Sequence, residues 1–219
     1  MKRSLGSTHR AFLFREYFAI LKLVNDIIPL EGFFVRHHAL VEGNEVHLLD
    51  EGFIGGIGRI KRFLQSRHLE FKNIKSSVIS HGHLDHTLNT ARLKELSGCQ
   101  VFAPQKDRNL IEGHHHNGDL NKVGGLLQHI GSTLTNHQAP KVDQWFHDGD
   151  RLDIFGGLEI VALPGHTPGH CGFLQKARRL LFANDLFQTT SANQSLLLES
   201  SPTITWRPSP VSLRQTSSQ

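Results

Sequence analysis

Four side chains that can bind a metal ion lie within six positions of one short segment, the run SHGHLDHT at residues 80–87. A β-branched run precedes this segment and a helix-like stretch follows it, so we expect a strand that ends in a tight turn. Side chains two positions apart point to the same face of an extended chain, so His81 and His83 can share one face. Asp85 and His86 lie beyond the turn, where they could reach a second ion. Imidazole and carboxylate ligands without thiolates suit zinc, iron or manganese and argue against a structural zinc finger.

Two further segments place metal-capable side chains after apolar, strand-like stretches. The run PGHTPGH at 164–170 contains His166 and His170, and the run LFAND at 181–185 ends in the carboxylate of Asp185. The alternative is that the histidines lie in surface loops by chance, since the chain has 16 of them. Three strand ends that all carry such residues predict instead that loops far apart in the sequence converge on one ion.

The runs HGHLDH, PGHTPGH and LFAND, in this order, resemble the metallo-β-lactamase superfamily, and in particular its glyoxalase II-like, or hydroxyacylglutathione hydrolase-like, branch. The turn Asp50-Glu51-Gly52, after the strand-like run 46–49, is similar to a further family element, an Asp-x-Gly turn below the metals. The resemblance covers roughly residues 27–188. It implies an α/β (α+β) fold, the four-layer αββα metallo-β-lactamase-like sandwich, with the metals at one edge and the C-terminal part incomplete.

The resemblance also implies which residues bind metal. The first ion would be bound by His81, His83 and His166, the second by Asp85 and His86, with Asp185 bridging the two. Three neutral imidazoles would leave one position on the metal open for water, and the metal would lower the pKa of that water towards about 7, which suits attack on a carbonyl. Asp85 would orient the water and could pass a proton to the leaving group.

Asp50 and His170 are predicted to support this site. A buried Asp50 carboxylate could orient a ligand imidazole, and the alternative is an aspartate that caps its own turn. His170 could line the cavity or hold a ligand, and the alternative is a hydrogen bond that stabilises its loop. His114, His115 and His116 are adjacent and point in different directions, so they cannot all bind one ion. We predict a solvated loop there, with contact to the substrate cavity as the alternative.

The C-terminal part departs from the family pattern. Dinuclear members supply another histidine to the second metal from near the C-terminus, but this chain has no histidine after His170. Residues 189–219 are rich in Ser, Thr and Pro without a clear period, which is typical of an irregular or disordered tail. Either the second site lacks a ligand, or this end of the chain is truncated or altered. The domain would then span 25–188, after an N-terminal extension at 1–24 that could add a helix.

Periodicity predicts the order of the elements that must position these side chains. Strands are expected at 33–41, 45–49, 72–80, 100–103, 148–155, 158–163, 171–174 and 180–183, and helices at 57–67, 104–111 and from Thr87, as N-cap, to Ser97. Pairs of strands that alternate with helices favour two sheets packed face to face with helices outside. His37, His38 and His47 are predicted to be strand-face residues rather than ligands.

Length and composition exclude several classes of protein. A chain of 219 residues suits one domain with tails, and a net charge of +4 predicts no nucleic-acid surface. No run of about 18 apolar residues occurs, so we expect no membrane span, and the N-terminal stretch lacks the features of a signal peptide. Two cysteines, Cys99 and Cys171, argue against a disulfide framework and fit a cytoplasmic location.

The predicted function is that of a metal-dependent hydrolase, in which water activated by a (di)zinc centre attacks a thioester or related acyl substrate. The substrate would be a small molecule, and the charge of the metals favours an anionic one. The first alternative is a mononuclear iron oxygenase resembling the persulfide dioxygenases of this fold, which use the counterparts of His81, His166 and Asp185. The second is a degenerate, non-enzymatic paralogue without a complete second metal site. A nuclease would need a basic groove or a substrate arm, which the sequence does not show.

Overall fold

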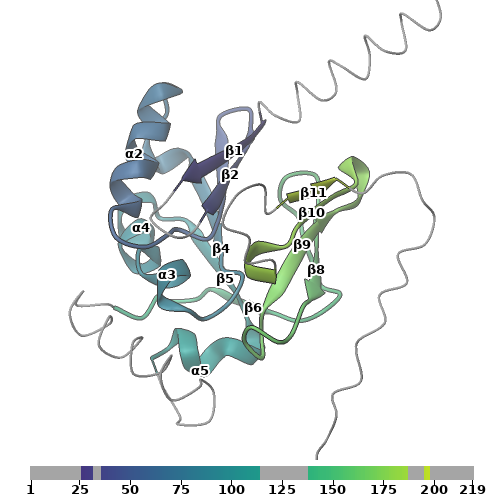
Figure 1. The fold of residues 1–219 in the computed structure, drawn as a ribbon. Helices are drawn as coiled ribbons and strands as arrows, with labels where there is room; N and C mark the ends of the chain where they lie inside the picture. Colours follow the sequence, from purple (N-terminus) through teal and green to yellow (C-terminus); the bar gives the residue numbers. More distant parts are fainter. Residues whose placement is uncertain (1–25, 32–35, 114–137, 187–194, 198–219) are drawn as a thin grey trace, which may run out of the picture.

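The computed structural model describes residues 26–31, 36–113, 138–186 and 195–197. The predicted N-terminal extension, the three histidines at 114–116 and most of the predicted C-terminal tail lie outside these residues. Within the described residues two β-sheets pack face to face, and helices lie beside the first of them (Figure 1). None of the helices in this part of the chain combines the length and the apolar character needed to cross a membrane.

The first sheet is mixed and has the strand order β1-β2-β3-β4-β5-β6. Its strands are β1 (Ile27–Glu31), β2 (Arg36–Glu42), β3 (Glu45–Leu49), β4 (Ile74–Val78), β5 (Gln100–Pro104) and β6 (Gln144–Phe146). The first three pair antiparallel, and β3 to β6 pair in parallel. Parallel neighbours need crossover connections, which contain helix α2 (Gly56–Ser66) between β3 and β4, and α3 (Leu84–Thr87) and α4 (Thr90–Ser97) between β4 and β5.

The second sheet is antiparallel and has the order β11-β10-β9-β8-β7. Its strands are β7 (Arg151–Leu152), β8 (Leu158–Ala162), β9 (Cys171–Gln175), β10 (Leu180–Phe182) and β11 (Ser195–Leu197). A short helix, α5 (Arg108–Ile111), follows β5, and single 3₁₀ turns occupy Phe71–Asn73, Gln105–Asp107, Lys176–Arg178 and Asn184–Leu186. The ends of β4, β8 and β10 therefore lie just before the three runs that carry the metal-capable residues.

Alternation along the strands divides the core into two layers. Leu48 packs with Ile60 and Leu64 of α2, between the first sheet and the helices. The next residue, Leu49, packs with Phe173 and other residues of the second sheet, because successive side chains of a strand point to opposite faces. This arrangement confirms the predicted two-sheet sandwich. In the described residues the helices pack on the outer face of the first sheet. Helices, first sheet and second sheet are therefore three of the four predicted layers.

The structure corrects several predicted boundaries. β1 was not predicted, and the expected strand at 148–155 is reduced to the two residues of β7. The carboxylates of Asp148 and Asp150 accept backbone hydrogen bonds from Ala162 and His147 in a turn, so this stretch cannot extend as a strand. Ser195–Leu197, within the predicted tail, is instead an edge strand beside β10.

The predicted start of the helix at Thr87 is also wrong. Thr87 ends α3, where its hydroxyl donates to the His83 carbonyl oxygen over 3.1 Å, and Asn89 is the N-cap of α4. The Asn89 amide does not cap the helix but donates to the carbonyl oxygens of Gly52 and Phe53. The helix therefore begins two residues later than predicted, and the Asn89 side chain connects its start to the turn after β3. The C-terminal stop at Gly98 was predicted correctly, with a left-handed φ of 70°.

Candidate metal centre

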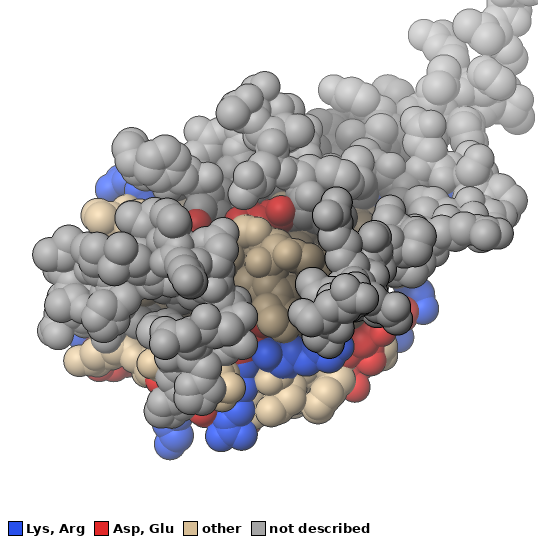
Figure 2. Space-filling model, turned by 60° about the horizontal axis from the view of Figure 1, so that its bottom comes forward, with Lys and Arg blue, Asp and Glu red and all other residues tan. Residues whose placement is uncertain are grey.

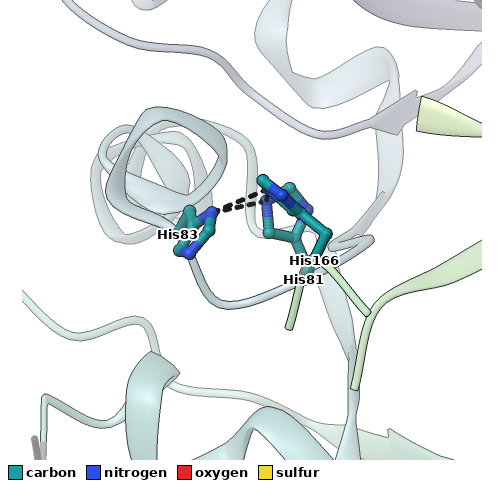
Figure 3. A group of neighbouring side chains, drawn as sticks. All are labelled: His81, His83 and His166. Carbon is teal, nitrogen blue, oxygen red and sulfur yellow. Dashed lines mark hydrogen bonds between the residues drawn. The ribbon is translucent and has the colours of Figure 1, made fainter. Parts of the chain in front are cut away.

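Three imidazole rings converge at the edge of the sandwich where β4 and β8 end (Figure 3). The His81 Nε2 atom lies 3.1 Å from His83 Nδ1 and 3.1 Å from His166 Nε2. His83 Nδ1 lies 2.9 Å from His166 Nε2, which closes the triangle. His81 is fully buried, whereas the other two rings are partly exposed, so the centre is open to solvent on one side.

The hydrogen bonds behind His81 assign its tautomer. The Ser80 hydroxyl donates to a carboxylate oxygen of Asp50 over 2.8 Å, so its oxygen must accept the 2.9 Å hydrogen bond from His81 Nδ1–H. With its proton on Nδ1, a neutral His81 presents the lone pair of Nε2 to the other two rings. Burial and the neighbouring histidines hold the pKa of His81 well below its usual range, and burial and His166 lower the pKa of His83 to about 4.

This donor set fits a metal ion. Nitrogen ligands at about 2.0–2.1 Å from a tetrahedral zinc ion lie about 3.3 Å apart, close to the 2.9–3.1 Å between these three atoms. Neutral rings have one lone pair each, and three nitrogens cannot satisfy one another all at once by hydrogen bonds. The arrangement therefore suits a cation better than it suits the imidazoles alone.

A second group shares His81 with the first. It adds His86 and Asp185, whose Nε2 and Oδ2 atoms lie 3.3 Å apart. The same Asp185 oxygen lies 3.5 Å from His166 Nε2, so this carboxylate faces both groups. Asn184, which precedes Asp185, has a φ of 46° and donates its side-chain amide to the Cys171 carbonyl oxygen, so the turn accepts asparagine there.

His86 is held between two carboxylates. Its Nδ1 atom lies 2.8 Å from an Asp50 oxygen, and its Nε2 atom faces Asp185. Burial alone would lower the pKa of His86, but Asp50 and Asp185 raise it well above its usual value. Burial would likewise raise the pKa of Asp185, and the hydrogen bond from His86 instead lowers it to about 2. A site that stabilises an extra proton in this way has the negative charge to stabilise a metal cation in its place.

Asp50 contacts residues of the loop that serves both groups of metal-capable side chains. It follows β3 with a left-handed φ of 59° and is 1% exposed. One carboxylate oxygen accepts from the Ser80 backbone N–H, and the other accepts from the Ser80 hydroxyl and faces His86. Its hydrogen bonds therefore reach across to the loop that carries His81 and His86, rather than capping its own turn. This is the placement expected of a residue that orients ligand imidazoles.

Asp85 and His170 lie at the margin of the centre. The Asp85 side chain is 38% exposed and one of its oxygens lies 4.0 Å from His86 Nε2, outside the two tight groups. His170 donates from Nδ1 to the Leu163 carbonyl oxygen over 2.9 Å, which is the loop-stabilising bond that the sequence offered as the alternative. Its ring centroid lies 5.2 Å from that of His81, and its Nε2 atom is buried without a hydrogen-bond partner in the described residues.

Sequence reasoning missed two buried carboxylates near the centre, Asp107 and Glu51. Asp107 lies just after β5, and β5 is parallel to β4, so both strands end at the same edge of the sheet. That topology was the available signal for Asp107. Glu51 follows Asp50 directly and accepts hydrogen bonds from the hydroxyls of Ser77 and Thr90.

Glu51 makes the stability of the metal-free protein depend on pH. Burial raises its pKa from 4.5 to about 8, against the opposing effect of the Thr90 hydrogen bond. Because the folded protein binds this proton more tightly than the unfolded chain, Glu51 destabilises the fold progressively as pH rises from about 4.5 to 8. Glu51→Gln should remove this dependence. Between pH 5 and 8 the free energy of unfolding of the variant should rise by up to about 4 kcal/mol relative to that of the parent.

Urea unfolding in the presence of a chelator, at several pH values, measures this difference. The matched control is Glu45→Gln, because Glu45 is an exposed residue at the start of β3 and should leave the pH profile unchanged. If the free energy of unfolding changed with pH in the same way in the parent and in Glu51→Gln, the assignment of a buried, neutral Glu51 would be contradicted.

Comparison with known proteins agrees with this architecture. The family model of the Metallo-beta-lactamase superfamily matches residues 28–194. The hydroxyacylglutathione hydrolase GloC of Haemophilus influenzae is 32% identical over 169 residues, which cover 74% of this chain and 72% of that protein. The probable metallo-hydrolase YybB of Bacillus subtilis is 27% identical over 167 residues, which cover 74% of this chain and 64% of that protein.

Solved structures share the fold. A metallo-beta-lactamase family protein from Thermus thermophilus superposes with a TM-score of 0.57 at 21% identity, and the match covers 74% of this chain and 59% of that one. A metallo-beta-lactamase from Cronobacter sakazakii superposes with a TM-score of 0.56 at 23% identity, over 74% of this chain and 58% of that one. The chain thus spans less than two thirds of these structures. Its sequence match and its fold agree, and the chain belongs to the metallo-β-lactamase superfamily and resembles its hydroxyacylglutathione hydrolases.

Proposed function

We propose that this protein is a metal-dependent hydrolase that cleaves a thioester or a related acyl substrate with an activated water molecule. The observation that carries the proposal is the triangle of imidazole nitrogens, each within 3.1 Å of the other two, open to solvent on one side. The relative GloC, with 32% identity, is named a hydroxyacylglutathione hydrolase, which supports a thioester as the substrate class.

The residues have distinct parts in this proposal. His81, His83 and His166 would hold one ion, His86 and Asp85 would hold a second, and Asp185 would bridge them. A divalent ion bound here would lower the pKa of a coordinated water towards about 7 and polarise a substrate carbonyl. Asp85 is the partly exposed carboxylate of the set, so it can orient a water molecule and pass a proton to the leaving group. Asp50 holds His81, through Ser80, and His86 in place.

We propose zinc as the metal, with two ions per chain when both groups are filled. Within the described residues the second group holds His81, His86 and Asp185, with Asp85 beside it, and no histidine follows His170 in the sequence. One observation favours the alternative of a single iron: His166 Nε2 lies 3.1 Å from His81 and 3.5 Å from Asp185, so two imidazoles and one carboxylate also converge. Metal analysis separates the two, because near two zinc ions support hydrolysis and one iron supports oxygenation.

A small pocket lies beside the centre, at His170. It has a volume of about 40 Å³, and His170 and Cys171 line it together with the apolar side chains of Phe146 and Ile160. Lys106 is an exposed cation among the lining residues. Figure 2 shows tan surface between a group of acidic side chains and a group of basic ones. We also propose a cytoplasmic location, which the two free, buried cysteines support.

The test is turnover of a panel of acyl substrates by the purified protein of known metal content. The panel contains glutathione thioesters of 2-hydroxy acids, uncharged thioesters, simple esters and a phosphodiester. We expect turnover of the anionic thioesters, its loss with a chelator, and its return when zinc is added back. Zinc-loaded protein that cleaves none of the acyl substrates would contradict the proposal, and so would unchanged turnover in His83→Ala.

A further inference from the structure

Asp107 joins the two loops that carry the histidine triangle. It is 1% exposed and lies in the 3₁₀ turn between β5 and α5. One carboxylate oxygen accepts from the Gly82 backbone N–H over 2.9 Å and from the Thr167 hydroxyl over 2.6 Å. The other oxygen accepts from the Gly169 backbone N–H over 2.6 Å. All three donors come from segments at least 25 residues away in the sequence.

The positions of these donors connect Asp107 to the metal centre. Gly82 lies between His81 and His83, and Thr167 follows His166 directly. The first loop leaves β4 of the first sheet, and the second loop connects β8 and β9 of the second sheet. Asp107 therefore spans the two sheets at their edge, and its hydrogen bonds help to set the distance between His83 and His166.

Gly82 and Gly169 pack closely against the segment that contains Asp107. A Cβ atom added to Gly169 would lie 2.7 Å from Asp107 Cγ. A Cβ atom added to Gly82 would lie 2.5 Å from the Cβ atom of Leu110 in α5 and 3.4 Å from that of Asp107. A side chain at either position would push the loops away from the segment that contains Asp107. Both glycines are thus explained by close approach to this segment.

The charge of Asp107 also suits a place beside a metal. In the described residues its carboxylate oxygens accept hydrogen bonds from two backbone N–H groups and one hydroxyl, which are neutral donors that suit a carboxylate. The carboxylate belongs to neither group of metal-capable atoms. It can therefore complement the positive charge of an ion without binding it.

We propose that Asp107 is a positioning residue of the metal centre, which holds the loop of His81 and His83 at metal-binding distance from the loop of His166. The inference rests on the proposed metal function. It predicts that loss of this carboxylate lowers the affinity for zinc more than it lowers the free energy of unfolding of the metal-free protein. Residues that hold metal ligands in place typically contribute about 10–100-fold to metal affinity.

The test measures zinc affinity by competition with a chromophoric chelator, and stability by urea unfolding of the metal-free protein. Asp107→Asn keeps the size of the side chain but turns one acceptor into a donor, and we expect a 10–100-fold loss of zinc affinity. Asp143→Asn is the matched control, because Asp143 also accepts a backbone N–H, from Val101, and a side-chain hydrogen bond, from Lys94, outside the two ligand loops. This control should keep parent zinc affinity.

Thr167→Val provides a milder variant, because it removes one of the three hydrogen bonds and keeps the shape of the side chain. We expect a smaller loss of zinc affinity, and this variant decides the question if Asp107→Asn does not fold. Parent affinity in whichever of the two variants folds would overturn the role of Asp107. A parent protein that binds no zinc would instead overturn the proposed function, so the two failures are distinguishable.

Discussion

Replacing His81 with alanine should abolish metal binding in both groups and lower acyl hydrolysis by at least about 10³-fold. His81 belongs to both groups of metal-capable residues, whereas His83 belongs to the first group alone. Loss of transition-state stabilisation by the metals, which supply several kcal/mol, accounts for a rate effect of this size. Metal content per chain should fall from near two to near zero in His81→Ala, and to about one in His83→Ala.

Elemental analysis of the purified variants, together with their turnover numbers, checks this pattern. His68→Asn is the matched control, because His68 is exposed and has a left-handed φ of 56°, a conformation that asparagine tolerates. It should keep the parent's metal content and turnover. Full metal content in His81→Ala would show that the ions bind elsewhere.

Asp50→Ala should have the largest effect on stability. The buried carboxylate accepts two hydrogen bonds from Ser80 and faces His86, which would be left as a buried cation with a single carboxylate, Asp185. Breaking a buried pair of this kind costs about 3–5 kcal/mol of unfolding free energy. Zinc affinity should fall by about 10–100-fold as well, because both His81 and His86 lose their support.

The pH dependence of this effect has a definite sign. Burial would raise the pKa of Asp50, but the charge of His86 lowers it, so the stability that Asp50 contributes is present above its unfolded value of 3.8 and is lost in acid. The raised pKa of His86 adds stability below its unfolded value of 6.5 that is lost as the pH rises through its folded pKa. The difference between parent and variant should therefore be largest near pH 6 and shrink below pH 4.

Urea unfolding of metal-free protein across this pH range makes the measurement. Asp153→Ala serves as the control, because Asp153 is an exposed carboxylate in the loop after β7. A loss of less than about 1 kcal/mol in Asp50→Ala at pH 6 would mean that the Asp50–His86 contact does not stabilise the fold.

Much of the candidate site is visible in the sequence because its residues lie at strand ends. The period of two predicts that His81 and His83 share a face, and contiguous motifs of seven and five residues predict the loops of His166 and Asp185. The structure brings these residues together as the sequence predicts. Asp85, which is expected among the ligands of the second metal, lies at the margin of the second group, with one oxygen 4.0 Å from His86 Nε2.

Asp107 could not be predicted in the same way. Its hydrogen bonds come from Gly82, Thr167 and Gly169, so its role depends on three segments meeting in space, and no local period marks it. β1 was missed for a related reason. It is a short strand that contains Pro29, and as the edge strand of the first sheet it is stabilised by pairing with β2.

The most direct test is a crystal structure of the zinc-loaded protein with anomalous data at the zinc absorption edge. An anomalous peak should lie about 2.0–2.1 Å from His81 Nε2, His83 Nδ1 and His166 Nε2, and a second, weaker peak should lie beside His86 and Asp185. A zinc-loaded crystal without a peak among the first three nitrogens, or with zinc bound by other residues, would contradict the metal centre on which the proposed hydrolysis depends.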